Sequence, residues 1–182
     1  MIILEKLELQ SIDEIYDKNL SSPVDIEQEG VSLSKNKLTD LIGFPKIING
    51  SIDVSFNNLT SLAGCPEKCS RLSIAGNSKI KSLKYVSQKL YHLDCSRCSI
   101  IDVSDLFNGE IEEKIIIEDV YLTYNEHMAV LPLLKFTIIL GGNYECSSII
   151  NNFEKNITKE NIFNCQQELI KSGFIQNARW IP

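Results

Sequence analysis

The sequence predicts an α+β repeat protein: a short right-handed solenoid with a parallel concave sheet, an N-terminal cap and a C-terminal helical cap. The first observation is a short pattern that occurs four times between Val31 and Val103, at intervals of 21, 20 and 21 residues. The second is that each copy alternates apolar and small polar residues, as a strand with one buried face does. No single copy can bury its apolar face alone, so the copies are expected to stack.

The four copies share the skeleton L-x-L-x-x-N-x-L. They read V-S-L-S-K-N-K-L-T-D-L from Val31, I-D-V-S-F-N-N-L-T-S-L from Ile52, L-S-I-A-G-N-S-K-I-K-S-L from Leu72 and L-D-C-S-R-C-S-I-I-D-V from Leu93. This skeleton at a period near twenty is typical of leucine-rich repeats. We therefore predict such repeats over residues 30–124, four of them clear and a fifth degenerate.

Each copy assigns its residues to the core by position. The first and third positions are expected to point inward, and the asparagines then turn the chain and satisfy backbone groups that no strand partner holds. The inward pairs are Val31 and Leu33, Ile52 and Val54, Leu72 and Ile74, and Leu93 and Cys95. The turn positions are Asn36, Asn57 and Asn77, with Cys98 in the fourth copy. The remaining core positions are Leu38, Leu59, Ile80 and Ile100, followed by Leu41, Leu62, Leu83 and Val103.

Residues 1–29 are predicted to cap the N-terminal end of the solenoid. Leu7 and Leu9 alternate like a short strand, and Ser11 is a candidate N-cap with acidic residues in the first turn after it. Pro23 is expected to end that segment. Val24 and Ile26 alternate again and predict a second short strand.

Residues 125–182 are predicted to form the C-terminal helical cap. Ahead of them, Ile115 and Ile117 are candidates for the inward pair of the fifth strand. Three helices are expected: one from Pro132 to Gly141 and Gly142, one over Ser147 to Ile157, and one that Thr158 caps and Gly173 ends. The apolar side of the last helix would consist of Ile162, Phe163, Cys165, Leu169 and Ile170, with Phe174 folded back on it.

Two of the repeats continue in a specific way, as L-T-D-L-I-G-F-P at Leu38 to Pro45 and L-T-S-L-A-G-C-P at Leu59 to Pro66. This L-T-x-L-x-G-x-P motif resembles the repeats of the small leucine-rich repeat proteins of large tailed bacteriophages and related bacterial proteins. The segment C-Q-Q-E-L-I-K-S-G-F-I-Q-N-A-R-W at Cys165 to Trp180 is similar to their closing helix. The resemblance implies a virus-encoded accessory protein that acts in the infected cell, and it carries over no catalytic residues.

Charge and hydropathy narrow the class of partner. The net charge is −6 and the basic residues are scattered singly, which argues against binding to duplex nucleic acid. The N-terminal residues do not combine a basic start with a long apolar run, so we expect no signal peptide. No apolar run in the sequence reaches the length of a membrane span. We expect a cytoplasmic protein, in the host cytoplasm if the protein is viral.

The candidate catalytic and metal-binding residues have simpler explanations. Cys65 and Cys69, with the C-x-x-C of Cys95 and Cys98, could supply four thiolates to zinc. The repeat frame instead places Cys95 and Cys98 at structural positions, so we expect buried thiols and neither a metal nor a cofactor. Two nucleophile–base combinations, Ser73 with His92 and Asp94, and Cys146 with His127, lack the features of a hydrolase site. We therefore expect a protein that is not an enzyme.

The exposed side of the predicted concave sheet is the better candidate for a site. Small serines lie between larger groups there, and Arg and aromatic side chains are common energetic anchors of interfaces. Glu118 would join them if a fifth strand forms; the alternative is a solvated face without function. The predicted partner-binding residues are Lys35, Asp53, Phe56, Arg71, His92, Asp94 and Arg97.

These observations favour a non-enzymatic protein-binding module. Through the resemblance, the expected partner is a bacterial host or defence protein that the chain modulates or inhibits. Two alternatives stay open: a structural or assembly accessory of the virus, and a small-ligand or nucleotide binder in a groove between the concave face and the helical cap. In the second, Arg71, His92 and Arg97 would hold the ligand. The edge strands of an open sheet also make a homo-oligomer possible.

Overall fold

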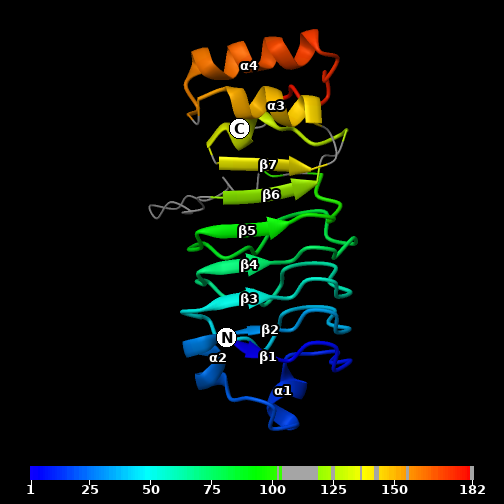
Figure 1. Ribbon diagram of the computed structural model, residues 1–182, viewed down its shortest axis with the longest axis vertical. Coiled ribbons are helices and arrows are strands. Elements are labelled where there is room, and N and C mark those ends of the chain that lie inside the picture. Colours follow the sequence, from blue (N-terminus) through cyan, green and yellow to red (C-terminus); the bar gives the residue numbers. More distant parts are fainter. Residues whose placement is uncertain are drawn as a thin grey trace.

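The computed structural model describes residues 1–101, 103, 119–123, 126–135, 137–141, 144–154 and 156–180. Within this part of the chain, seven short strands form one open parallel sheet and follow one another in chain order. Figure 1 shows them side by side along an elongated molecule, with helices at both ends. The protein is therefore an α+β protein with a solenoid-like sheet. The strands are β1 (Ile2–Ile3), β2 (Gly30–Ser32), β3 (Ser51–Asp53), β4 (Arg71–Ser73), β5 (His92–Cys95), β6 (Asp119–Thr123) and β7 (Thr137–Gly141).

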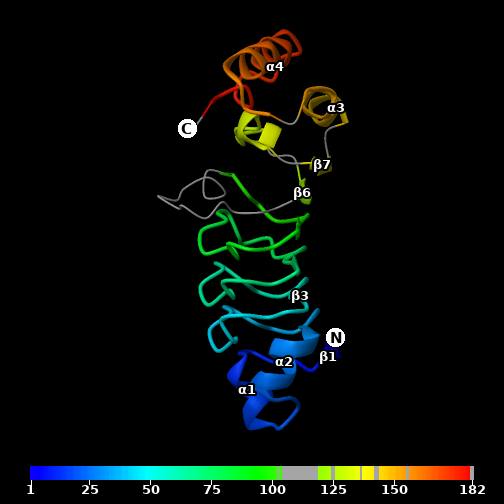
Figure 2. The same cartoon turned by 90° about the vertical axis from the view of Figure 1, so that its left-hand side faces the viewer.

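The strand register follows the alignment of the four sequence copies. Val31, Ile52, Leu72 and Leu93 are direct neighbours across β2 to β5. The sheet forms one side of the molecule, and the connecting segments return on the other side (Figure 2). The copies therefore lie on top of one another, each one segment of the coiled chain.

The interior is filled by the positions that the sequence assigned to it. All four inward pairs are buried, and so are the two later apolar positions of every copy, from Leu38 to Val103. These residues belong to one continuous hydrophobic cluster that extends from Leu4 to Ala178. Because each segment covers the apolar side of the next, the sheet is stabilised by stacking and not by any segment alone.

Three buried asparagines connect the segments by side-chain hydrogen bonds, and we call Asn36, Asn57 and Asn77 the asparagine ladder. Nδ2 of Asn57 donates to the carbonyl oxygens of Leu33 (2.9 Å) and Val54 (3.0 Å), and its Oδ1 accepts from the backbone N–H of Leu38 at 3.0 Å. Asn36 and Asn77 make the equivalent bonds. The ladder satisfies buried backbone groups of two adjacent segments at once.

The fourth copy has no asparagine to continue the ladder. Cys98 occupies the asparagine position, and its Sγ donates to the carbonyl oxygen of Ile74 at 3.2 Å. A thiol is a weak donor and cannot replace the two donors and the acceptor of an amide. The sequence-based assignment of Cys98 to this position is confirmed, and its bonding is reduced to one contact.

The glycines of the two L-T-x-L-x-G-x-P segments allow close stacking of the loops. Gly64 has a φ of +85°, and a Cβ at this position would lie 2.3 Å from the backbone nitrogen of Ile42 in the preceding segment. Only glycine fits such a contact. Tyr85 takes the aligned position in the next segment and also adopts a positive φ, of 70°.

At the N-terminal end, the predicted strands are wrong. β1 is formed by Ile2 and Ile3, which pair with Val31 and Ser32. Leu7 and Leu9 lie in the following turn, where their backbone N–H groups both donate to Oδ1 of Asn36. The amide of Asn36 therefore fixes this turn in place of a second strand.

Two short helices complete this end. Helix α1 (Asp13–Asp17) has Ile12 at its N-cap with no side-chain cap, so the predicted capping role of Ser11 is wrong. Helix α2 (Pro23–Glu29) replaces the strand predicted from Val24 and Ile26. Ser22 and Asp25 form a capping box at its start, and Pro23 at the first helical turn favours a helix over the alternation that follows.

The fifth strand begins later than the sequence indicated. Val120 of β6 pairs with Leu93, and Leu122 pairs with Cys95, so Val120 and Leu122 are the inward pair. The predicted pair, Ile115 and Ile117, lies outside the described residues, as does Glu118. The prediction failed because it assumed a spacing of 22 residues from Leu93, whereas the observed spacing is 27.

The helix predicted from Pro132 to Gly141 is also wrong. A 3₁₀ helix, η2 (Leu131–Lys135), is followed by strand β7, which pairs with β6 along its whole length. The β-branched run Thr137, Ile138 and Ile139 favours a strand over a helix.

The last two helices agree better with prediction. Helix α3 (Tyr144–Asn152) packs against β7, and helix α4 (Lys159–Lys171) packs on α3 and η2 at the end of the molecule (Figure 1). Thr158 caps α4 by accepting from the N–H of Asn161 at 3.2 Å, as predicted. The N–H of Phe174 donates to the carbonyl of Leu169 at 2.8 Å around Gly173, which confirms the predicted helix end.

Helix α4 buries fewer of its predicted apolar residues than expected. Cys165 and Leu169 are buried and Ile162 packs partly against the core, whereas Phe163 and Ile170 are exposed. Among the described residues, no helix has the length and apolar character needed to cross a membrane.

Candidate binding face

The face of the sheet that points away from the core carries polar side chains in two rows, and we call it the outer sheet face. Ser51, Arg71 and His92 are neighbours in the first row. The second row runs through Asp53, Ser73, Asp94 and Tyr121. Parallel strands lie about 4.8 Å apart, so side chains far apart in the sequence meet at contact distance.

A hollow of about 300 Å³ lies on the outer sheet face over β3, β4 and β5. Four of the seven predicted site residues line it: Asp53, Arg71, His92 and Asp94. Ser51 and Ser73, which the repeat frame also places on the exposed face, line it as well, above a floor of Ile52 and Leu72. Met1 completes the lining, and no sequence pattern indicated its position.

The two aspartates of the hollow are held in the same way. Oδ1 of Asp53 accepts from the N–H of Ser55 at 2.9 Å, and Oδ1 of Asp94 accepts from the N–H of Ser96 at 3.0 Å. These bonds fix each carboxylate over the turn that follows its strand. The aspartates therefore have a structural role, and a partner would meet them already oriented.

Arg71 and His92 bring the basic and aromatic groups to the hollow. Within the described residues, no ion pair or side-chain hydrogen bond involves the exposed guanidinium of Arg71. The ring of His92 lies 4.7 Å from the ring of Tyr121, centroid to centroid, at an angle of 50°. Tyr121 was missed because the fifth strand was predicted too early in the chain.

The other three predicted site residues lie beyond the C-terminal ends of the strands. Lys35, Phe56 and Arg97 occupy equivalent turn positions with φ values of 59°, 54° and 57°. Gly76 takes the same position, with a φ of +74°, in the segment between Phe56 and Arg97. We call these four residues the turn column.

Phe56 covers Gly76 within the turn column. A Cβ at Gly76 would lie 2.5 Å from Cδ1 of Phe56, so the ring rests on the bare backbone of the next segment. The side chain still keeps 44% of its surface exposed. An aromatic ring that is supported on one side and open on the other is suited to contact with a partner.

The cysteines are placed as structural thiols. Sγ of Cys95 donates to the carbonyl of Tyr121 at 3.2 Å, and burial raises the pKa of Cys98 to about 11. Cys65 and Cys69 both lie within hydrogen-bond distance of Oγ of Ser87, at 3.3 Å and 3.4 Å. In the part of the chain that the structure describes, no three His, Cys, Asp or Glu side chains gather in a way that could hold a metal ion.

Cys146, one of the two candidate nucleophiles, is buried. Burial, with a smaller effect of the Glu145 carboxylate, raises the pKa of the Cys146 thiol to about 12. This thiol stays protonated at neutral pH, which makes it a poor nucleophile. His127, its proposed base, is exposed and lies 3.4 Å from a carboxylate oxygen of Glu126.

Comparison of the chain with protein-family models, with curated proteins and with solved structures gave no significant match.

Proposed function

We propose that the chain is a right-handed leucine-rich repeat solenoid with an N-terminal cap (residues 1–29) and a C-terminal helical cap (residues 125–182). The sequence period near twenty, the in-register stacking of Val31, Ile52, Leu72 and Leu93, and the asparagine ladder support this assignment. Helices α1 and α2 at one end, with α3 and α4 at the other, would shield the apolar ends of the stack.

On this fold we propose a non-enzymatic binding module that engages a protein partner through the outer sheet face and the turn column. The observation that carries the proposal is the hollow, where Asp53, Arg71, His92 and Asp94 converge from three segments of the chain. Phe56 adds an exposed aromatic contact nearby in the turn column. Oriented charges of both signs beside an exposed ring are the usual ingredients of a specific protein interface.

The size of the face limits how it binds. The three strands under the hollow span about 10 Å between the outermost two, because adjacent strands are about 4.8 Å apart. A standard interface covers roughly 800 Å² on each partner. We infer that the partner also contacts the turn column, the loops or one of the helical ends.

For the partner itself, the sequence resemblance supports a bacterial host or defence protein that a phage accessory protein modulates in the host cytoplasm. An assembly role in the virus is the alternative, and it predicts the protein in purified particles. A small-ligand role is favoured by one observation, since a hollow of about 300 Å³ is at the lower end of ligand-site volumes. That hollow lies over β3 to β5, not beside the C-terminal helices where a ligand groove was expected.

An affinity pull-down from bacterial lysate tests the proposal. Three proteins are compared with the native chain: the hollow variant Arg71→Glu, the turn-column variant Phe56→Ala/Arg97→Glu, and a control, Tyr144→Ala/Lys159→Glu. The control changes an exposed aromatic and an exposed basic residue of the C-terminal helices. Thermal unfolding of each variant verifies that it is folded.

A stoichiometric partner that both site variants lose and the control keeps is the expected result. Loss only in the control moves the interface to α3 and α4. Absence of any partner, together with a homo-oligomer in solution and presence in virus particles, contradicts the proposal and favours the assembly role.

A further inference from the structure

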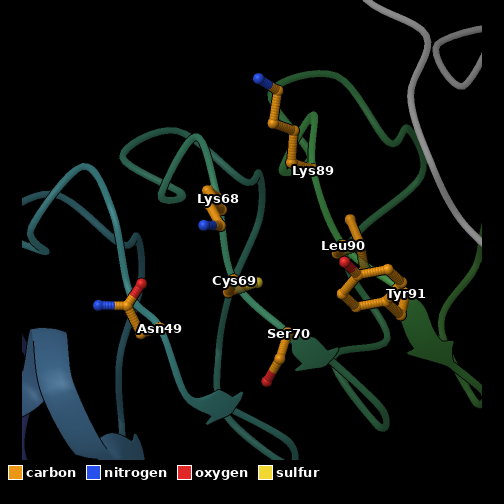
Figure 3. A pocket seen from close by; sticks show the side chains of 7 residues that line it. All are labelled: Asn49, Lys68, Cys69, Ser70, Lys89, Leu90 and Tyr91. Atoms are coloured by element: carbon orange, nitrogen blue, oxygen red, sulfur yellow. The ribbon is translucent and has the colours of Figure 1, made fainter.

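A second hollow, of about 380 Å³, lies just before the strands begin, and it shares no lining residue with the hollow of the outer sheet face. Its lining comes from three successive segments of the chain (Figure 3). We call it the flank hollow. The lining residues are Asn49, Lys68, Cys69, Ser70, Lys89, Leu90 and Tyr91.

The two lysines of the flank hollow are neighbours in a backbone ladder. Isolated parallel bridges join Ile47 to Lys68 and Lys68 to Lys89, so the two lysines lie in register on adjacent segments. Like charges directly opposite one another are unfavourable. Ile47 occupies the same ladder position in the preceding segment, so the fold does not require lysine here.

No carboxylate lines the flank hollow, although the chain as a whole carries a net charge of −6. The acidic residue next to Lys68 in sequence is Glu67, and its Oε1 lies 3.2 Å from Nζ of Lys46. In the described part of the chain, no ion pair involves Lys68. The lining of the hollow therefore holds two lysines and no carboxylate.

The other walls combine hydrogen-bond donors with apolar surface. Cys69 and Leu90 are buried and form an apolar floor. The ring of Tyr91 is 57% exposed, and in Figure 3 its hydroxyl points across the hollow toward the side where Cys69 and Asn49 lie. Asn49 and Tyr91 belong to segments two apart, which gives a separation of about 10 Å between their backbones.

We propose that the flank hollow binds an oxyanion, phosphate or carboxylate, carried on an aromatic or other apolar group. Lys68 and Lys89 would neutralise the charge, and the hydroxyls of Ser70 and Tyr91 with the amide of Asn49 would donate to its oxygens. The apolar part would lie on Tyr91 and the floor.

The test uses the native chain labelled with ¹⁵N and four probes: phenyl phosphate, benzoate, inorganic phosphate and phenol. We expect phenyl phosphate to shift the backbone amide resonances of residues 68–70 and 89–91 at millimolar concentration. Phenol and inorganic phosphate should bind more weakly, because each lacks one half of the ligand. The comparison of phenyl phosphate with benzoate identifies which oxyanion the hollow prefers.

Variants separate a built site from general charge attraction. Lys68→Gln and Lys89→Gln should each weaken phenyl phosphate binding by about fivefold, as expected for one partly exposed charge pair. Tyr91→Ala should abolish the advantage of phenyl phosphate over inorganic phosphate. Lys159→Gln, an exposed lysine on α4 at the far end of the molecule, should change nothing.

Three results overturn the proposal. The first is that no probe shifts the six amide resonances. The second is that Lys159→Gln weakens phenyl phosphate binding as much as Lys68→Gln and Lys89→Gln do, and the third is that phenyl phosphate and inorganic phosphate bind with equal affinity. The substitutions are at exposed surface positions, and an unchanged thermal midpoint in each variant shows that the folded chain is being measured. The result is independent of the pull-down, since the flank hollow and the outer sheet face have no lining residue in common.

Discussion

Replacing Asn57 with alanine should cost several kcal/mol although the side chain touches neither hollow. Its amide donates to the carbonyls of Leu33 and Val54 and accepts from the N–H of Leu38, at 2.9 to 3.0 Å, and the residue is buried. Asn57→Ala therefore removes three hydrogen bonds and leaves the N–H of Leu38 without its partner. The two carbonyls keep their bonds from Asn36 and Asn77. At about 1 kcal/mol for each lost bond, and somewhat more for the buried N–H left unpaired, the expected loss of unfolding free energy is about 3–4 kcal/mol.

The loss is large compared with the total stability of a typical domain, which is about 5–15 kcal/mol. For a chain of this size, each kcal/mol lowers the thermal midpoint by about 2–4 °C, so we expect a decrease of about 10 °C. Urea unfolding followed by circular dichroism gives the free energy, and calorimetry gives the midpoint. Asn57→Cys should fall between alanine and the native residue, because Cys98 keeps one such bond at the equivalent position.

The control is the next residue, Asn58, whose side chain is exposed and has no hydrogen bond within the described part of the chain. Asn58→Ala should change the unfolding free energy by less than about 0.5 kcal/mol. If Asn57→Ala loses no more than this control, the asparagine ladder does not stabilise the stack and the reasoning is refuted.

Two further predictions concern the loops and the thiols. Gly64→Ala should lower the unfolding free energy by more than about 3 kcal/mol because its Cβ meets backbone, whereas Gly173→Ala, with a similar φ of +87° and open space, should cost about 1–2 kcal/mol. If urea unfolding shows equal losses of free energy for the two variants, the positive φ alone determines the cost and the contact with backbone adds nothing. Burial raises the pKa of Cys98 to about 11 and of Cys146 to about 12, so the stability these thiols contribute is intact below their unfolded pKa of about 8.5 and is lost as the pH rises toward the folded values. Above a pH of about 8.5 the unfolding free energy should fall by about 1.4 kcal/mol per thiol and pH unit, and it should fall less steeply in Cys146→Ala. An unfolding free energy that does not change with pH in this range would contradict the burial of the two thiols.

The central part of the fold was predictable because its signals are local and repeated. The alternation at Val31 and Leu33, and the asparagine that follows at Asn36, specify a strand and a turn within six residues. Four copies of the same signal then fix the register of the sheet. The segments at the two ends are not repeated, so each prediction there depended on the pattern of a single segment with no aligned copy to support it.

Two of the errors at the ends have the same physical origin, since in each a local pattern is outweighed by a neighbouring one. Val24 and Ile26 alternate like a strand, but the capping box of Ser22 and Asp25 starts a helix. Pro132 and Gly141 frame a helix, but the β-branched residues between them pair with β6 once that strand is available as an edge.

The candidate site was predictable only in part. Asp53 and Asp94 could be placed on one face from alternation alone, and the structure places both at the hollow. The positive φ of Lys35, Phe56 and Arg97 has no sequence signal apart from Gly76 in the same column, so their separation from the hollow was not foreseen. The flank hollow was invisible because it exists only when the loops of three segments stack.

The asparagine ladder stops at Cys98, and this gives the molecule a built-in weak joint. Up to Asn77, an amide side chain bonds to both sides of each junction between segments, whereas at the next junction the side chain adds only one sulfur contact, to Ile74, to the backbone hydrogen bonds. Amide hydrogens should therefore exchange with solvent in two blocks, slowly before this joint and faster after it. When the chain is pulled from its two ends, we expect the junction between β4 and β5 to open before the junctions between β2, β3 and β4.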